Sequence, residues 1–179
     1  MMSGLRLFTR IALFSALVYV FSWATSYLPN VNLVFFIVFS TGFLWGALPG
    51  ALVGIIGMGI FTAFNPYGPA HPYLMAAQMI GAGLSGPVGA GFSKTAWSGH
   101  DRWLSVGLLA LTGGVCTVLY YIPVNLVDAW LIGPFWPRFV TAWGWTLISL
   151  GANVVIFPLL FGVTRYLYAW ESRSACRGS

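Results

Sequence analysis

The chain has 179 residues, of which 59% are hydrophobic and 6% are charged, with a formal net charge of +5. A soluble domain carries a charge on about a quarter of its residues, so this composition excludes one. It predicts an all-α integral membrane protein, with residues 1–179 forming a single membrane domain in the lipid bilayer. The positive charge then indicates orientation in the membrane rather than a nucleic-acid partner.

The sequence contains no charged residue between Arg10 and Lys94. This stretch of about 80 residues is enough for three or four bilayer crossings. It also leaves residues 11–93 without a carboxylate, lysine or arginine for catalysis, metal binding or proton relay. Neither a nucleotide-binding loop nor a hydrolase or zinc-protease motif occurs, so we expect no enzymatic activity, no cofactor and no metal.

Clusters of Pro, Gly and Asn divide the apolar sequence into six predicted helices. We expect these helices at about 7–28, 31–48, 49–64, 73–92, 103–123 and 139–168. The second and third are separated only by Gly46 to Gly50, which allows a tight hairpin. Three prolines between 65 and 72 forbid a regular helix there. A loop of 124–138 precedes the sixth helix, and a polar cytoplasmic tail of 169–179 follows it.

Six crossings would place both chain termini on the same side of the membrane. All but one of the Lys and Arg residues then fall on this shared side: Arg6, Arg10, Lys94, Arg102, Arg165, Arg173 and Arg177. Arg138 lies on the opposite side. Because basic residues are retained in the cytoplasm, this distribution predicts a compact six-helix bundle with both termini cytoplasmic, in a multi-pass membrane protein.

Small residues recur at four-residue spacing in the glycine-rich second to fourth helices. These residues are Gly42, Gly46, Gly50, Gly54, Gly81, Ser85 and Gly89. In lipid, close helix contact depends on small residues that let backbones approach. The spacing favours tight internal packing, with a surface for a partner protein as the alternative. Ala12 and Ala16 share one face of the first helix and form a flat groove for a partner helix, although this spacing also occurs in internal packing.

Polar and aromatic side chains gather at the expected outer ends of the helices. The candidate substrate-binding residues are Asn30, Asn32, Asn65, Tyr67, His71, Tyr73, Gln78, Tyr121, Asn125, Asp128, Arg138, Trp143 and Trp145. A small-molecule site is usually an apolar, aromatic concavity with a few placed polar groups. This set fits a flat, mostly uncharged ligand. The alternatives are a plain turn at 65–68, interfacial anchoring by the two tryptophans, and an ion pair between Asp128 and Arg138.

These features together resemble the substrate-binding subunit (S component) of energy-coupling factor transporters, which are bacterial vitamin importers. The resemblance rests on the length, the six helices, Ala12-x-x-x-Ala16, the glycine-rich helices and the polar aromatic outer loops. It implies that a vitamin-like ligand binds under the outer loops, in the bacterial cytoplasmic membrane. It also implies that the Ala12 and Ala16 face docks on a transmembrane coupling subunit that carries two cytoplasmic ATPases, which drive delivery inward.

With Arg138 as the one outward cation, a neutral or weakly charged ligand of the riboflavin, pterin or corrinoid type is expected, rather than a multiply phosphorylated one. Two other classes of protein are alternatives, of which the first has a similar size and helix count. A membrane scaffold of the rod-shape-determining type would bind partner proteins and need no aromatic outer pocket. A self-contained small carrier would need polar residues along a complete path through the membrane.

Overall fold

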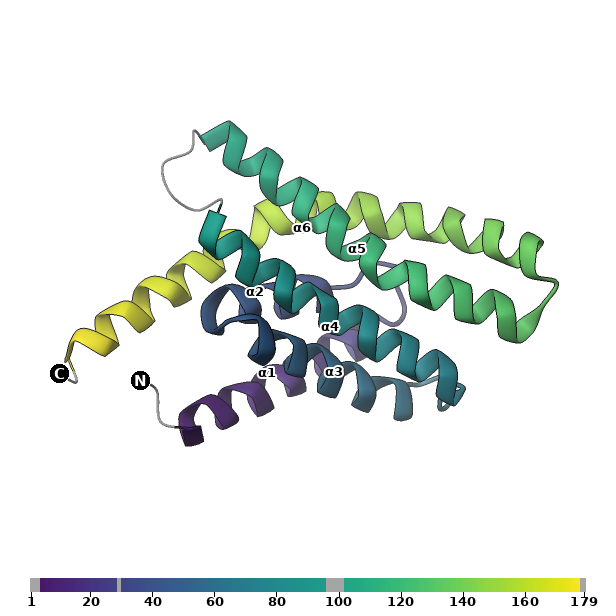
Figure 1. The fold of residues 1–179 in the computed structure, drawn as a ribbon, viewed down its shortest axis with the longest axis horizontal. Coiled ribbons are helices and arrows are strands. Elements are labelled where there is room, and N and C mark those ends of the chain that lie inside the picture. The colour runs from purple at the N-terminus through teal and green to yellow at the C-terminus, as the bar shows by residue number, and fades with distance from the viewer. Residues whose placement is uncertain (1–3, 29, 96–101, 178–179) are drawn as a thin grey trace.

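The computed structural model describes residues 4–28, 30–95 and 102–177, and these residues fold into six α-helices without a strand. The helices are α1 (Gly4–Ala24), α2 (Val34–Trp45), α3 (Ala47–Ala63), α4 (Pro72–Thr95), α5 (Arg102–Ile132) and α6 (Phe135–Arg177). They run in alternating directions, so both ends of the chain lie at the same end of the bundle (Figure 1). We call this the terminal end and the opposite one the loop end. The prediction of an all-α bundle of six helices is confirmed.

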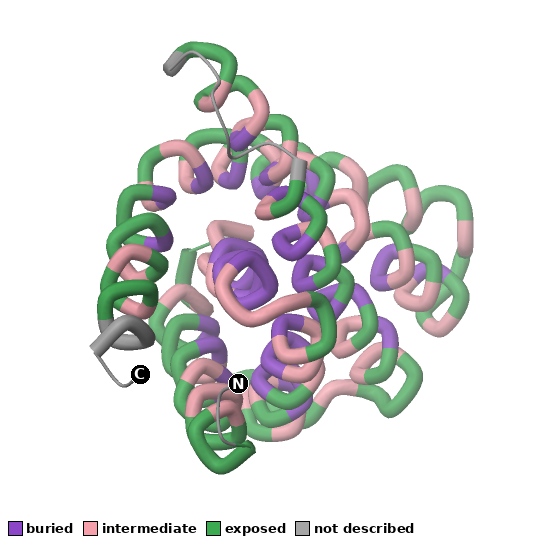
Figure 2. The backbone as a smooth tube through the Cα atoms, turned by 60° about the vertical axis from the view of Figure 1, so that its left-hand side comes forward, coloured by how far each residue is buried: buried purple, intermediate pink, exposed green. Residues whose placement is uncertain are grey.

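Helix α2 forms the centre of the bundle. Most of its residues are buried on every side of the helix: Val34, Phe35, Phe36, Val38, Phe39, Ser40, Thr41, Gly42 and Phe43. It contacts all five other helices, and Figure 2 shows it as a buried coil surrounded by helices with exposed outer faces. A helix that is apolar all round belongs in an interior, which explains why its hydrophobic residues show no helical periodicity.

Three helices, α1, α5 and α6, are long and apolar enough to cross a membrane. The sequence predicted six crossings, and the other three helices do not meet this criterion. Helix α2 has 12 residues and α3 has 17. At 1.5 Å per residue, α2 rises about 18 Å, less than the ~30 Å hydrocarbon core. Helix α4 has 24 residues, but its glycines and polar side chains lower its hydropathy.

Helices α2, α3 and α4 pack backbone against backbone through glycines. A Cβ atom added to Gly50 would lie 2.8 Å from the Cα atom of Gly86, and one added to Gly42 would overlap the Gly86 carbonyl. A Cβ atom at Gly89 would overlap the carbonyl of Phe39 in the same way. Any side chain at these positions would force the helices apart. The glycine series therefore serves internal packing, as the spacing favoured.

Gly46 alone joins α2 to α3. Its φ angle of 101° lies in the left-handed region, which only glycine adopts at low cost. The chain reverses direction within this one residue, and its N–H still donates to the carbonyl of Gly42 at 2.9 Å. The tight hairpin expected between the second and third helices is confirmed.

The last two helices are longer than the sequence indicated. Helix α5 continues through Pro123 to Ile132, and α6 begins at Phe135 and extends to Arg177. The expected loop of 124–138 is thereby reduced to Gly133-Pro134, and the expected polar tail is helical as far as Arg177. A proline in the first turn of a helix is tolerated, because the N–H that it lacks would have no partner within the helix. A proline in the interior of a membrane helix is tolerated where neighbouring helices satisfy the backbone groups that it frees. Most of the predicted link of 93–102 lies outside the described residues.

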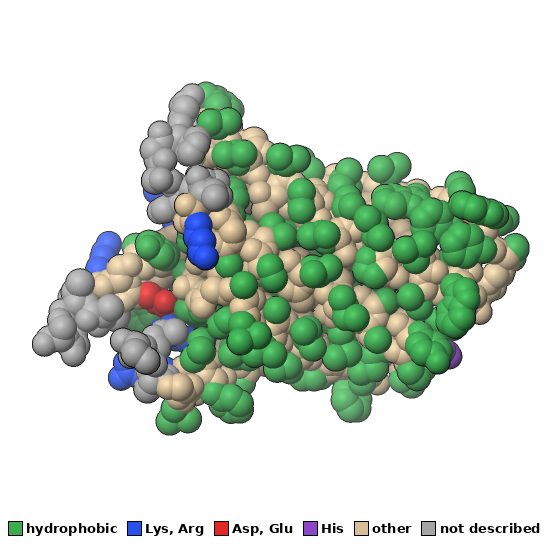
Figure 3. Space-filling view, viewed as in Figure 1, with side chains coloured by type: hydrophobic (Ala, Val, Ile, Leu, Met, Phe, Trp, Pro, Cys, Tyr) green, Lys and Arg blue, Asp and Glu red, His purple; other side chains and the backbone are tan. Residues whose placement is uncertain are grey.

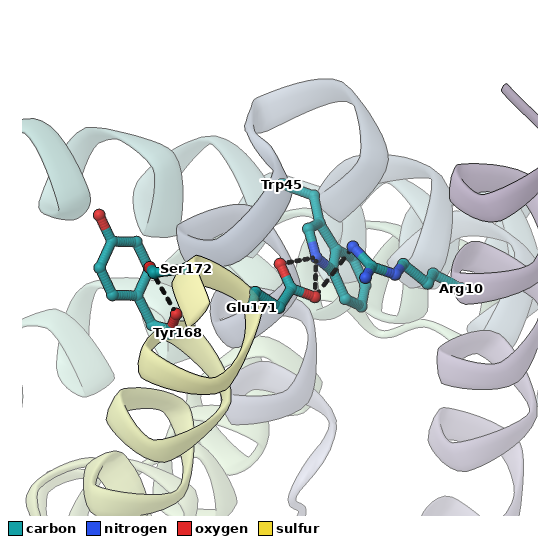
Figure 4. Close-up of polar contacts among 5 residues, drawn as sticks. All are labelled: Arg10, Trp45, Tyr168, Glu171 and Ser172. Carbon is teal, nitrogen blue, oxygen red and sulfur yellow. Dashed lines mark hydrogen bonds and ion pairs between the residues drawn. The ribbon is translucent and has the colours of Figure 1, made fainter. Parts of the chain in front are cut away.

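Charged side chains gather at the terminal end of the bundle. Figure 3 shows Lys, Arg and acidic side chains there and hydrophobic side chains over the rest of this face. At this end the Arg10 guanidinium, the Trp45 indole and the Glu171 carboxylate point toward one another (Figure 4). They come from α1, α2 and α6, so three separate helices meet through polar side chains at one place.

Candidate functional site

A cavity of about 380 Å³ lies at the loop end of the bundle. Its walls come from the α1–α2 link, α3, the α3–α4 link, α4 and α5. Six of the side chains predicted from the sequence line it: Asn30, Asn32, Asn65, Tyr67, Gln78 and Tyr121. The structure thus brings residues from two links and two helices to one site. Its volume lies in the range of about 300–1,000 Å³ that small-molecule sites occupy.

None of the described residues that line this cavity carries a charge. Apolar surface is supplied by Met58, Phe61 and Val124, and the hydroxyl groups of Thr62 and Tyr120 add to the amides. A charged ligand would lose its hydration here without gaining an ion pair, which is costly. The cavity therefore suits an uncharged molecule that exchanges hydrogen bonds with amide and hydroxyl groups.

The α1–α2 link is fixed by the side chains of two asparagines. Asn30 has a φ angle of 57°, which asparagine tolerates better than most residues, and its Oδ1 accepts a hydrogen bond from the Tyr121 hydroxyl at 2.9 Å. The Oδ1 of Asn32 accepts from the backbone N–H of Val34 at 2.9 Å, at the start of α2. These two bonds hold the link against α5 and the central helix.

The α3–α4 link is held by Asn65 and by two long-range bonds. The Oδ1 of Asn65 accepts from the Tyr67 N–H at 2.9 Å, which closes a local turn. The Tyr67 hydroxyl donates to the Ser26 carbonyl at 3.0 Å, and the Trp23 indole N–H donates to the Phe64 carbonyl at 3.2 Å. These contacts join the two links, so the turn predicted at 65–68 is also part of the cavity wall.

Three other predicted residues form a second pocket of about 430 Å³ around the α5–α6 connection. Asp128, Arg138 and Trp145 line it. The Arg138 Nε donates to Asp128 Oδ2 at 2.8 Å, so the two charged residues pair with each other. The lining of this pocket shares no residue with that of the amide-lined cavity. Among the described residues, no three His, Cys, Asp or Glu side chains cluster as a metal site.

The remaining predicted residues do not line either pocket. Asn125 is buried, and its Nδ2 donates to the Thr146 hydroxyl at 2.9 Å, which links α5 to α6. The Trp143 ring lies 6.1 Å from that of Phe139, within a row of aromatic rings on α6. Two further candidates are exposed and contact each other: the rings of His71 and Tyr73 are 5.5 Å apart.

Several lining residues were not among the candidates, namely Thr25, Ser26, Leu28, Val31, Met58, Phe61, Thr62, Ala70, Tyr120 and Val124. Most of them are apolar or small and look like ordinary helix residues in sequence. Thr62 lies in the last turn of α3, and its carbonyl accepts a hydrogen bond from Asn65 Nδ2 at 3.2 Å. Its buried carbonyl also accepts the N–H of Ala70 at 3.0 Å.

The predicted docking residues Ala12 and Ala16 are both exposed on α1. The buried residues of this helix are Ser15, Val18 and Ser22, which lie on a neighbouring side of it. The two alanines therefore do not contribute to the internal packing that their spacing also allowed. They leave a shallow surface on the outside of the bundle.

No family model matches this chain, and no curated protein and no solved structure matches it. The fold and the cavity are therefore described from the structure alone. They define an all-helical protein with three helices of membrane-spanning length and hydropathy and an uncharged, amide-lined cavity at the loop end.

Proposed function

We propose that this chain is the substrate-binding subunit of an importer of the energy-coupling factor type, in the cytoplasmic membrane of a bacterium. In this proposal it binds a vitamin or a related small molecule on the outside and releases it inward. The observation that carries the proposal is the cavity of about 380 Å³ lined by amides and tyrosines. A scaffold protein has no use for such a cavity.

The position of the cavity supports an outward-facing site. Arg6 and Arg10 begin α1, and Lys94 lies in the last turn of α4, so basic residues gather at the terminal end. Basic segments favour the cytoplasmic side of a membrane. The cavity lies at the opposite, loop end, which faces outward if all six helices are embedded with both termini in the cytoplasm. Helix α2 is surrounded by protein, so its short length is compatible with this arrangement.

A binding subunit of this kind needs an external source of energy. The sequence has no nucleotide-binding loop, and we propose that a transmembrane coupling subunit with two cytoplasmic ATPases supplies it. The exposed Ala12 and Ala16 on α1 offer this subunit a surface on which helix backbones can approach closely. Both alanines lie in the middle part of α1.

Copurification tests the proposal. The full-length chain, tagged and expressed in its native host, is purified in mild detergent, and both the bound proteins and the small molecules are identified by mass spectrometry. We expect two ATPase subunits, a second membrane protein and a stoichiometric uncharged ligand. Recovery of cell-shape or division proteins without a small molecule would instead support the scaffold. A purified chain that alone transports solute into liposomes would support a self-contained carrier.

A further inference from the structure

The amide-lined cavity contains two kinds of polar group. The side chains of Asn30, Asn32 and Asn65 all form hydrogen bonds within the protein, at 2.9 Å in each case, and so they fix the shape of the wall. The Oε1 atom of Gln78 is different, because it is buried and has no hydrogen-bond partner among the described residues. A buried polar atom without a partner is rare in folded proteins, because it loses its bonds to water without replacement.

Tyr120 lines the same cavity as Gln78. One turn along α4 from Gln78, a Cβ atom on Gly81 would lie only 2.9 Å from the Tyr120 Cα atom, so α4 and α5 are in close contact here. Tyr120 is only 5% exposed, and its hydroxyl forms no hydrogen bond within the described part of the chain. Its ring lies 4.8 Å from that of Phe35 and 5.0 Å from that of Tyr121, which fixes its orientation.

The chemistry of these two groups defines what they can bind. A glutamine side chain presents an acceptor and a donor next to each other in one plane, and a tyrosine hydroxyl can donate or accept. The complementary edge is an N–H adjacent to a C=O, as in a lactam or a carboxamide. A carboxylate lacks the donor and would be unpaired, because no described lining residue is a cation.

We infer that Gln78 and Tyr120 are the specificity-determining pair of this cavity, and that they select a planar, uncharged ring carrying a lactam or carboxamide edge. The inference rests on the proposed function only in taking the cavity as the ligand site. Gln78 Oε1 accepts the ligand N–H, while Gln78 Nε2 and the Tyr120 hydroxyl donate to its carbonyl. Asn30, Asn32 and Asn65 keep their hydrogen bonds within the protein when the ligand binds.

The test uses the full-length chain in lipid nanodiscs and three small probes of the same ring size. Quinazolin-4(3H)-one carries the lactam edge, its 3-methyl derivative lacks the N–H donor, and quinazoline lacks the edge. Binding is followed by tryptophan fluorescence and calorimetry. We expect the lactam to bind about tenfold or more tightly than either analogue, because the analogues leave Gln78 unpaired.

Two variants assign this preference to the pair. Tyr120→Phe removes a donor to the carbonyl, so it should weaken binding of both the lactam and its methyl derivative relative to quinazoline. Gln78→Leu should reduce the discrimination between the lactam and its methyl derivative to less than about threefold. Tyr73→Phe, an exposed tyrosine outside the cavity, is the matched control and should keep it. The inference is overturned if the wild-type chain binds the three probes equally or binds none of them. This outcome needs only the wild-type chain, so it does not depend on whether the variants fold. Copurification of a ligand and ATPases decides the proposed function separately.

Discussion

The Arg10 guanidinium lies 2.9 Å from the Glu171 carboxylate and joins α1 to α6. No Cα atom of α1 comes within 8 Å of one of α6 in the described residues, and an apolar cleft of about 250 Å³ lined by α1, α2 and α6 lies between them. The Trp45 indole N–H donates to the same carboxylate at 3.0 Å, and the guanidinium stands over the Trp45 ring. Helices α1 and α6 are therefore held together through side chains rather than through backbone packing.

Replacing this carboxylate should loosen the bundle. Glu171→Leu removes the acceptor of the Trp45 indole and the charge opposite Arg10, and both charged side chains are mostly buried, at 21% and 25% exposure. We expect a loss of about 1–3 kcal/mol in the free energy of unfolding. Denaturant titration of the purified chain in detergent measures it. Ser172→Ala, on the exposed neighbouring residue, serves as control, and an unchanged midpoint for Glu171→Leu would show that the ion pair does not stabilise the fold.

The glycines of α4 offer a matched pair for testing the internal packing. Gly86→Ala places a methyl group against the backbone of Gly50 and Ala51, whereas a Cβ atom at Gly91 on the same helix meets nothing within 4 Å. We expect Gly86→Ala to destabilise the chain by about 1–3 kcal/mol or more, and Gly91→Ala to be neutral or slightly stabilising. Thermal unfolding in detergent distinguishes them. Equal stability of the two variants would contradict the packing of α4 on α2 and α3.

Tyr121→Phe tests whether the α1–α2 link shapes the cavity. The substitution removes the 2.9 Å hydrogen bond to Asn30 and keeps the ring. We expect a loss of about 1 kcal/mol in the free energy of unfolding and faster hydrogen exchange of the backbone amides of residues 30–33. Tyr166→Phe, exposed near the other end of the bundle, is the control. Exchange rates that stay the same in both variants would mean that the link is fixed by other contacts.

The sequence predicted the number of helices because prolines and glycines interrupt the chain at the right places. It also predicted the internal role of the glycines, since four-residue spacing has a direct meaning in helix packing. It did not predict that α5 continues past Pro123, because a proline can end a helix or be accommodated inside it, and only the neighbouring helices decide. As a result Asn125 and Asp128, expected in a loop, lie on α5.

The candidate site was predicted less completely than the fold for a related reason. The order of segments shows which residues reach the loop end, but it does not show in which direction each side chain points around its helix. Gln78 and Tyr121 point into the amide-lined cavity, whereas Asn125 points toward Thr146 between α5 and α6. Asp128 and Arg138 satisfy each other in a separate pocket. Such pairings join residues from different segments and therefore depend on the tertiary fold.

The exposed alanines of α1 give the sharpest test of a partner. Ala12→Leu and Ala16→Leu add bulk to a surface that is exposed in the described structure, so the free energy of unfolding should stay within about 0.5 kcal/mol of the wild type. If a coupling subunit packs closely on this face, each substitution should reduce copurification of the ATPases about tenfold or more, because a leucine separates helix backbones that small residues bring together. Leu13→Ala, on a neighbouring exposed position, should leave the complex intact. Recovery of the complex with both leucines present would locate the docking surface elsewhere, whereas loss of the complex with unchanged stability and ligand binding would assign it to α1.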